Sequence, residues 1–556
     1  MDNHNALGLS DLEIPLIDHV ETDEELGRSL EATGAGATTL SSSKIGHSLG
    51  FGALVFLIYY NIGVPFGDEG AVKAAGPFMV NLAFFVLLPI LWQLPICLIT
   101  AELTTTLKDR RGSIAWVSEA FGEQWGFIDA IWSLATSFFD TALFPLIIAD
   151  FLELTGPPRW LFVYFAVALL TWAVYRGSAV VASTEEIVFV LTLIPLTIMV
   201  GLGLFKMDWG LAMTPPALDT VDWKSFIQIM FWTSTYWQKV ASVGPDVKNC
   251  SKNFPRAILY ACGMQILING AIHFVAAGAT DPAKYPHWGP GYIRVAADAI
   301  AGGKWLGTWI TAMSAVSNSG SFLSEMSVTS QTLVGMAERG FMPMKIMAES
   351  RHGTHPWALG TIAVVIAMSQ PLDFKELILV CNFLYTLQTG LELLAFYRLR
   401  TARPGLRRPF QIPGGRVGMT LALVLPMATL VVVITTVTAS AAGVGIAIAL
   451  GSGVASHVLF RSRLGRRYGF GEMSTARDRS DSEGRTGMSL NGEGSGIVSL
   501  AWEVKVPSET AEGEERKAEN SDGDDEGRTS GDSPTSNSGG SSSENEGASE
   551  AELSDA

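Results

Sequence analysis

The sequence predicts an all-α integral membrane protein with twelve transmembrane helices. Apolar runs of about 20 residues recur along the chain, and each is long enough to cross a bilayer as a helix. Of all residues, 48% are hydrophobic and only 17% are charged. Two of the apolar runs are interrupted by helix-breaking or polar residues, which a membrane helix tolerates only where the interruption lines a cavity or meets a partner.

The acidic residues concentrate at the two ends of the chain. Residues 1–44 carry nine acidic and two basic side chains, and residues 469–556 carry 21 and seven. Because the whole chain has a net charge of −16, the part between the tails is mildly basic. The sequence therefore predicts a membrane domain over residues 45–468. Disordered acidic tails are expected on both sides of it, at 1–44 and at 469–556, the latter rich in Ser and Gly. No basic stretch suggests binding to nucleic acid.

The apolar runs place the spans in order along the chain. A short amphipathic helix is expected at 113–124, leading into the third span. The predicted spans are 47–74 (broken), 77–105, 125–153, 159–175, 180–205, 224–247 (broken), 256–279, 305–336, 357–371, 374–398, 417–438 and 441–461.

Basic residues gather in alternate loops between these spans. Examples are the loop with Lys108, Arg110 and Arg111, and the loop from Arg398 to Arg416. The positive-inside rule then predicts that both termini are cytoplasmic. No cleavable signal peptide is visible at the polar, acidic N-terminus. The plasma membrane is the default expectation, with an internal membrane as the alternative.

The first span is interrupted at Tyr59–Glu69. Gly63, Pro65 and Gly67 fall within five residues, and proline lacks the N–H that a helix needs while glycine lowers helix stability. Broken helices at the centre of the membrane hold the solute in many secondary transporters. We therefore expect the backbone of Asn61, Ile62, Gly63 and Val64 to cradle a substrate, the alternative being a plain hinge or helix end.

The sixth span is interrupted at Phe231–Lys239. Small hydroxyl residues and two indoles lie at mid-membrane there, and a lysine follows. Polar groups at that depth are costly and usually face a cavity. The first and sixth spans would correspond if spans 1–5 and 6–10 form two inverted repeats. Corresponding interruptions in two halves indicate a central solute site, although aromatic residues can also belong to an interfacial belt. The expected binding residues here are Trp232, Thr235, Tyr236, Trp237 and Gln238.

Among the carboxylates within the predicted spans, three are candidates for function. Asp140 is at the middle of the third span, where an ionised group needs a partner, a proton or a cationic ligand. We expect it to hold a substrate amine or to carry a coupled proton. Glu325 in the eighth span and Glu102 in the second are further candidates for proton coupling, with an arginine partner as the structural alternative for Glu102. Lys239 could replace a coupling cation or pair with one of these acids.

No arrangement of residues suggests an enzyme. The sequence shows no nucleophile–base pair, no phosphate-binding loop and no spacing typical of metal ligands. The cysteines, Cys97, Cys250, Cys262 and Cys381, are scattered and are interpreted as packing residues. We therefore expect neither a cofactor nor a metal site, and the expected partners are a small-molecule substrate, protons and the lipid bilayer.

Several motifs resemble the amino acid–polyamine–organocation superfamily, most of all its polyamine permease branch in plants and protists, which is related to the L-type amino acid transporters. The similarity covers residues 46–468 in colinear order. The motifs that carry it are Leu98–Leu103 (LITAEL), Asp140–Pro145 (DTALFP), Asp246–Asn249 (DVKN), Phe254–Ile258 (FPRAI), Glu325–Ser327 (EMS), 335–340 (GMAERG) and Arg407–Gly415 (RRPFQIPGG).

The resemblance implies a five-plus-five inverted repeat (LeuT-like) followed by two additional helices. It places the solute between broken spans 1 and 6, with spans 3 and 8 closing the pocket. Three positions depart from the branch, which has an amide at Thr235, a carboxylate at Gln238 and a tyrosine at Phe144. Phe144 completes the expected substrate-binding set. These differences leave both polyamines and amino acids open as substrates.

The predicted function is secondary active transport of polyamines or amino acids by proton-coupled symport and alternating access. One alternative is an obligate amino acid exchanger. Another is a transport-derived nutrient sensor that signals through its acidic tails. An apolar stretch at Ile497–Val506 could dock a cytoplasmic partner or be incidental.

Overall fold

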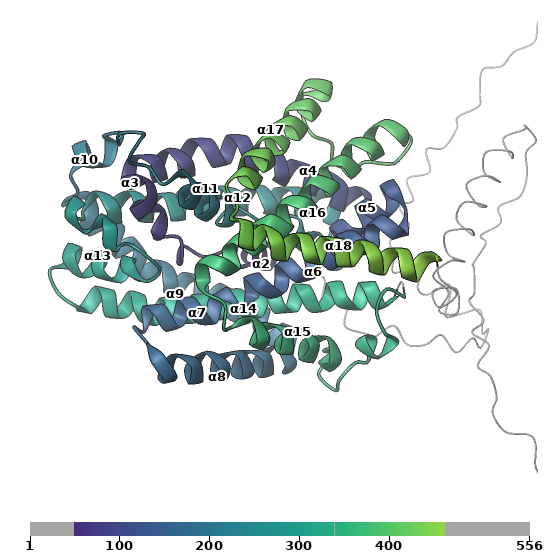
Figure 1. Ribbon diagram of the computed structural model, residues 1–556, viewed down its shortest axis with the longest axis horizontal. Helices are drawn as coiled ribbons and strands as arrows, with labels where there is room; N and C mark the ends of the chain where they lie inside the picture. The colour runs from purple at the N-terminus through teal and green to yellow at the C-terminus, as the bar shows by residue number, and fades with distance from the viewer. Residues whose placement is uncertain (1–48, 339, 462–556) are drawn as a thin grey trace, which may run out of the picture. The chain divides into compact units, whose positions relative to one another are not determined.

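The computed structural model describes residues 49–461 apart from residue 339, and the side chains of residues 178–186 are not described. Within these residues the chain is helical (Figure 1), with one isolated β-bridge between Leu49 and Val247. The two predicted acidic tails and the apolar stretch 497–506 lie outside the described residues. The prediction of an all-α membrane protein is confirmed.

Most predicted spans coincide with observed helices. Eight described helical stretches are long and apolar enough to cross a membrane, and α2 and α15 are shorter apolar helices. The corresponding elements are α2 (Phe51–Ile62), α3 (Gly70–Leu82) continuing through two π-helical turns to α4 (Leu94–Thr106), α6 (Glu123–Thr141) with α7 (Leu143–Phe151), α8 (Gly156–Tyr175), α9 (Ser178–Leu204), α11 (Trp223–Trp232), α12 (Cys250–Gly278), α14 (Trp305–Glu338), α15 (Pro356–Ser369), α16 (Phe374–Ala402), α17 (Gly415–Thr435) and α18 (Ala439–Arg461).

Three short α-helices of the described chain lie between the predicted spans. The amphipathic helix expected at 113–124 is present as α5 (Ser113–Phe121). The sequence analysis did not anticipate α13 (Tyr292–Ala301), which packs against α14 and α9, or α10 (Trp209–Met213). Both are too short to give an apolar run of span length, so a search for such runs does not find them.

The first span is broken where the sequence predicted. Helix α2 ends at Ile62, and α3 begins only at Gly70. Gly63 and Gly67 have φ angles of 124° and 102°, which residues with a side chain rarely adopt. A further kink at Gly76, directly before Pro77, marks the start of the second predicted span.

The sixth span is also broken. Helix α11 ends at Trp232, and a 3₁₀-helix, η3 (Lys239–Asp246), follows after a short non-helical segment. The indole nitrogens of Trp92 and Trp237 both donate to the carbonyl of Ser234, each at 2.8 Å. In an unbroken helix this carbonyl would accept a backbone N–H. At the break the two indoles take that place, because a buried carbonyl needs a hydrogen-bond partner.

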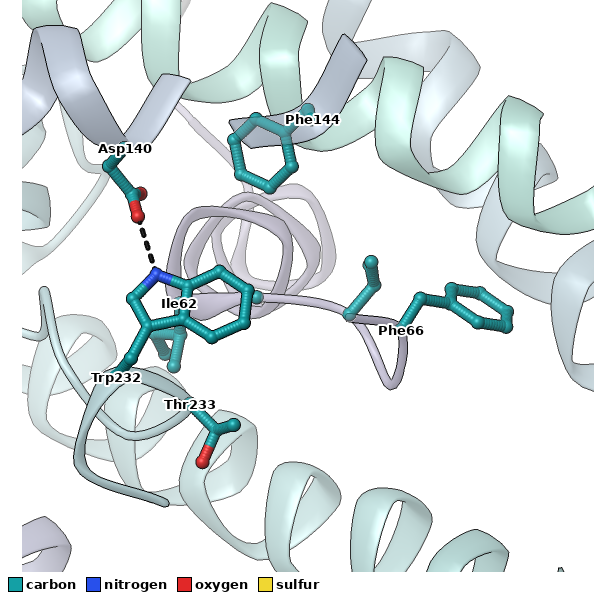
Figure 2. Close-up of a pocket in the computed structure, with 8 residues that line it drawn as sticks. Ile62, Phe66, Asp140, Phe144, Trp232 and Thr233 are labelled. Atoms are coloured by element: carbon teal, nitrogen blue, oxygen red, sulfur yellow. Dashed lines mark hydrogen bonds between the residues drawn. The ribbon is translucent and has the colours of Figure 1, made fainter. Parts of the chain in front are cut away.

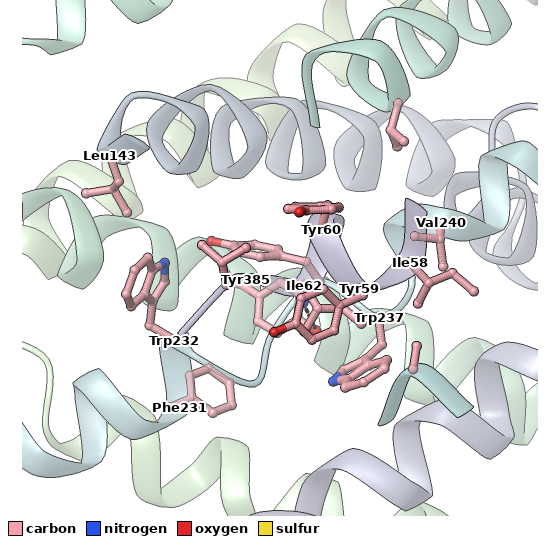
Figure 3. Close-up of a cluster of buried hydrophobic side chains, with 14 of the residues drawn as sticks. Ile58, Tyr59, Tyr60, Ile62, Leu143, Phe231, Trp232, Trp237, Val240 and Tyr385 are labelled. Carbon is pink, nitrogen blue, oxygen red and sulfur yellow. Dashed lines mark hydrogen bonds between the residues drawn. The ribbon is translucent and has the colours of Figure 1, made fainter. Parts of the chain in front are cut away.

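The two broken segments lie side by side. The backbone N–H of Leu49 donates to the carbonyl of Asp246 at 2.8 Å, which joins the chain ahead of α2 to the end of η3. Figure 3 shows Tyr59 and Ile62 from the first break in one buried cluster with Phe231 and Trp237 from the second. The fold therefore brings the two interruptions into a single region of the protein, although they are about 170 residues apart in the sequence.

Candidate functional site

A small cavity lies between the two breaks (Figure 2). Asp140 and Phe144 reach it from the third span, Trp232 and Thr233 come from the end of α11, and the remaining wall belongs to the first break. Its full lining is Ile62, Gly63, Val64, Phe66, Asp140, Phe144, Trp232 and Thr233. Asp140 is only 2% exposed, and the other lining residues are buried as well except Gly63, which is partly exposed.

Asp140 is the charged group of this cavity. The indole nitrogen of Trp232 donates to its Oδ1 at 2.8 Å (Figure 2), while Phe144 stands on the same side of the first break as the carboxylate. An ammonium group placed between them would meet one carboxylate and two aromatic rings. Cation–π attraction from such rings contributes about 0.5–2 kcal/mol each. The cavity therefore has the chemistry of an organic-cation site.

A buried ion pair lies next to Asp140. Lys239 at the start of η3 forms a salt bridge with Glu325 of α14, and its ammonium also lies over the ring of Tyr236, 3.5 Å from the ring centroid. The Glu325 carboxyl in turn interacts with Asp140. With all three groups ionised, this central cluster has a net charge of −1. It can be neutralised by one proton or by one cationic substrate group.

The predicted binding residues divide into two sets. Ile62, Gly63, Val64, Asp140, Phe144 and Trp232 line the cavity. The other five have buried side chains behind it, and are Asn61, Thr235, Tyr236, Trp237 and Gln238. Phe66 and Thr233 also line the cavity. Both lie within the predicted interruptions, Tyr59–Glu69 and Phe231–Lys239, but were not among the expected binding residues.

The second set supports the break in the sixth span. Gln238 accepts a hydrogen bond from the Tyr385 hydroxyl at 2.5 Å, and its amide nitrogen donates to the hydroxyl of Thr389 at 3.3 Å. The Tyr385 oxygen also accepts from the backbone N–H of Tyr236 at 3.0 Å. Tyr236 has a φ of 71°, a conformation that a bulky residue adopts only when its surroundings hold it there.

Glu102 has a different environment. Arg400 donates to its Oε2 at 2.6 Å, the backbone N–H of Ile412 donates to the same oxygen at 2.9 Å, and Arg408 Nε lies 3.6 Å from Oε1. Burial lowers the pKa of Arg408, and the nearby Glu102 carboxylate opposes this shift. The geometry favours the structural alternative for Glu102, in which it ties α4 to α16 and to the loop before α17.

A further polar cluster lies at the other end of the first break. His273 Nε2 is 3.0 Å from Asp68 Oδ1, and its Nδ1 donates to the carbonyl of Asn269 at 2.9 Å. Glu69 accepts from the backbone N–H of Gly67 at 2.9 Å and from that of Gly291 at 3.3 Å. These contacts fix the start of α3 against α12 and the entry to α13. In the described part of the chain, no three His, Cys, Asp or Glu side chains are grouped to hold a metal ion.

Comparison with known proteins identifies the family. The family model described as "Amino acid permease" matches residues 49–455. The chain is 36% identical over 386 residues to a polyamine transporter of Arabidopsis thaliana, which covers 67% of this chain and 77% of the relative. It is 34% identical over 384 residues to a polyamine transporter of Oryza sativa subsp. japonica, covering 68% and 72%.

A more distant relative has a different description. The glutamate/gamma-aminobutyrate antiporter of Lactococcus lactis subsp. lactis (strain IL1403) is 24% identical over 376 residues, covering 62% of this chain and 75% of the relative. The predicted resemblance to the polyamine permease branch is confirmed by these matches. The chain belongs to the amino acid permease family of the amino acid–polyamine–organocation superfamily, and is a multi-pass membrane transporter of a small molecule rather than an enzyme.

Proposed function

We propose that the protein is a proton-coupled symporter that moves polyamines or amino acids by alternating access. The observation that carries this proposal is Asp140, a buried carboxylate that lines a cavity between two broken helices. An ionised group at this depth is costly unless a proton or a cationic ligand compensates it. Binding and release of such a compensating cation is what a transport cycle provides.

The topology we propose has twelve spans, with spans 1–5 and 6–10 as inverted repeats. Its support is the occurrence of one break in the first span and one in the sixth, together with the backbone contact between Leu49 and Asp246. The membrane domain would then extend over residues 45–468 between two cytoplasmic tails. We propose the plasma membrane as its location, and the C-terminal tail as the part that would bind a cytoplasmic partner.

For a polyamine, Asp140 would hold one ammonium group while Trp232 and Phe144 enclose it. The names of the two plant relatives favour this substrate class. For an amino acid, the backbone at Ile62 and Gly63 would hold the carboxylate near the N-terminus of the half-helix that follows, and Asp140 would hold the amine. The net charge of −1 in the central cluster favours a substrate with excess positive charge.

We propose that protons act on the same central cluster. A proton on Asp140 or Glu325 would neutralise it when the substrate is absent. Glu102 remains the third proposed proton carrier, although its two arginine partners favour a structural role.

Uptake of labelled putrescine, spermidine and a panel of amino acids tests this function. We expect a polyamine to be taken up and its uptake to rise with an inward proton gradient. Asp140→Asn should reduce uptake at least tenfold, because a hydrogen bond to a charged group contributes about 1.5–3 kcal/mol and each 1.4 kcal/mol is a factor of ten in affinity. Unchanged uptake and pH dependence in Asp140→Asn would overturn the role given to this residue.

Obligate exchange is the second candidate, because a relative that is 24% identical over 376 residues is described as an antiporter. The two mechanisms differ in one measurement. A symporter accumulates substrate in vesicles that contain none, whereas an obligate exchanger takes up label only when substrate is already inside.

A further inference from the structure

A second pair of carboxylates lies buried where α6 packs against α16. Asp129 of α6 is 0% exposed and Glu392 of α16 is 2% exposed, and their charges act on each other. Neither oxygen of Asp129 has a hydrogen-bond partner among the described residues, and nor does Glu392 Oε2. The other oxygen of Glu392 accepts from the Gln388 amide at 2.8 Å.

No described basic group compensates this pair. From α5, only the uncharged side chain of Ser113 acts on Glu392, and α15 carries no charged residue. The charged groups around α6 and α16 are either paired with other residues or exposed. The paired groups are Arg111 with Asp109 and Glu123, Arg400 and Arg408 with Glu102, Glu119 with Arg403, Asp150 with Arg159, and Lys239 with Glu325. The exposed groups are Lys224, Glu338, Lys375, Glu376, Arg398, Arg416, His457 and Arg461.

Two ionised carboxylates are not stable in such surroundings. Burial penalises each charge, and mutual repulsion adds to the cost, because neither has a cation nearby. A proton shared between two adjacent carboxyl groups removes the repulsion, as in paired catalytic acids. The pair therefore holds at least one proton in this conformation.

The pair is connected to the central cluster by two facing polar stripes. On α6, Asp129, Ser133, Thr136 and Asp140 recur at spacings of four, three and four residues, so they share one helix face. On α16, the stripe consists of Cys381, Tyr385, Gln388, Thr389 and Glu392. Every member of both stripes is buried.

The stripes run antiparallel and meet at both ends. The Cys381 thiol lies 3.8 Å from the carbonyl of Thr136 and interacts with Asp140, whereas at the other end the charge of Glu392 acts on Asp129. The eleven residues from Asp129 to Asp140 correspond to about 16 Å along the helix axis. Between these ends, Tyr385 and Thr389 both bond to Gln238 of the broken sixth span. A change in the sixth span is therefore transmitted directly to the helix that carries Glu392.

We propose that Asp129 and Glu392 form a second proton-binding site of the transport cycle, in addition to the central cluster and separate from the cavity in which Asp140 meets the substrate. This inference rests on the proposed proton-coupled transport. When the sixth span moves, Gln238 shifts Tyr385 and Thr389, the seal around the pair opens, and its proton exchanges with water. Substrate and proton then occupy two sites on one helix face and are coupled through α16.

The test uses the full-length protein purified in detergent and reconstituted in proteoliposomes. Asp129→Asn and Glu392→Gln keep the shape of a protonated carboxyl, so both variants should fold. Spermidine exchange at equal pH on both sides should stay within threefold of the wild type, whereas accumulation driven by a proton gradient should fall at least tenfold. Glu376→Gln, an exposed acid on α16, is the matched control and should change neither.

Infrared spectroscopy gives a readout that does not depend on transport. The difference spectrum at neutral pH between the wild type and the variant that combines Asp129→Asn with Glu392→Gln should contain a band for the buried protonated carboxyl that the variant has lost. A difference spectrum without this band, or single variants with normal proton-driven accumulation, would overturn the inference. If the expected band is found but the wild-type protein shows no proton-driven uptake, the proposed symport is refuted. The result would then show only that Asp129 and Glu392 share a proton.

Discussion

Glu102 and Asp140 are both buried carboxylates within helices of the membrane domain, yet their surroundings are opposite. Glu102 is bound by Arg400, Arg408 and a backbone N–H, and it does not line the cavity between the two breaks. Asp140 has one indole donor, interacts with another acid and lines the cavity between the two breaks.

This difference separates a structural carboxylate from a functional one. Removing one member of a fully paired buried group leaves an uncompensated charge on its partner, so the substitution lowers the stability of the fold. A carboxylate that lines a cavity and has no cationic partner needs a cation or a proton to compensate its charge. Substituting it is therefore expected to reduce transport rather than stability. Burial alone does not separate the two cases, since Glu102 is 0% and Asp140 2% exposed.

The largest effect on stability is expected from Glu102→Gln. It leaves Arg400 and Arg408 without their counter-ion, and breaking a buried pair costs about 3–5 kcal/mol, less here because Arg400 is partly exposed. Thermal unfolding of the purified protein should show the loss, while KM for the substrate in the folded fraction should stay unchanged. The variant that combines Glu102→Gln with Arg400→Met should recover part of the stability. If Glu102→Gln instead left stability intact and abolished pH dependence, Glu102 would belong with Asp140.

Lys239 and Glu325 test whether the central cluster also depends on an ion pair. Either Lys239→Met or Glu325→Gln alone leaves a buried charge unpaired, whereas the two together remove both charges. A double-mutant cycle on thermal stability should give a coupling energy of about 1–3 kcal/mol. Additive effects would show that the pair does not hold η3 to α14. Lys224→Met, an exposed lysine at the start of α11, serves as the control.

The smallest effect is expected from Trp232→Phe. This change removes the N–H that donates to Asp140 but keeps an aromatic ring at the cavity wall. Loss of a hydrogen bond to a charged group, taken at about 1.5 kcal/mol, corresponds to roughly a tenfold rise in KM. Unfolding temperature should not change, in contrast to Glu102→Gln. A large loss of stability in Trp232→Phe would mean that Asp140, like Glu102, serves mainly to stabilise the fold. Trp223→Phe, an exposed indole at the opposite end of α11, is the matched control.

The sequence determined the class of the protein, the approximate limits of its helices and the positions of both breaks. These features are local: the length of an apolar run fixes whether it can span a bilayer, and Gly63, Pro65 and Gly67 interrupt a helix whatever surrounds them. The short helix α13 was not predicted, because it is too short to form a span and so gives no apolar run of that length.

Only the tertiary structure decided which buried acids are paired. Glu102 and Arg400 are 298 residues apart, and Lys239 and Glu325 are 86 apart, so no local pattern specifies these partners. The same holds for Asp129 and Glu392, whose significance depends on the absence of any described cation around them. A carboxylate's function follows from the charges packed around it, and those charges come from distant parts of the chain brought together by helix packing.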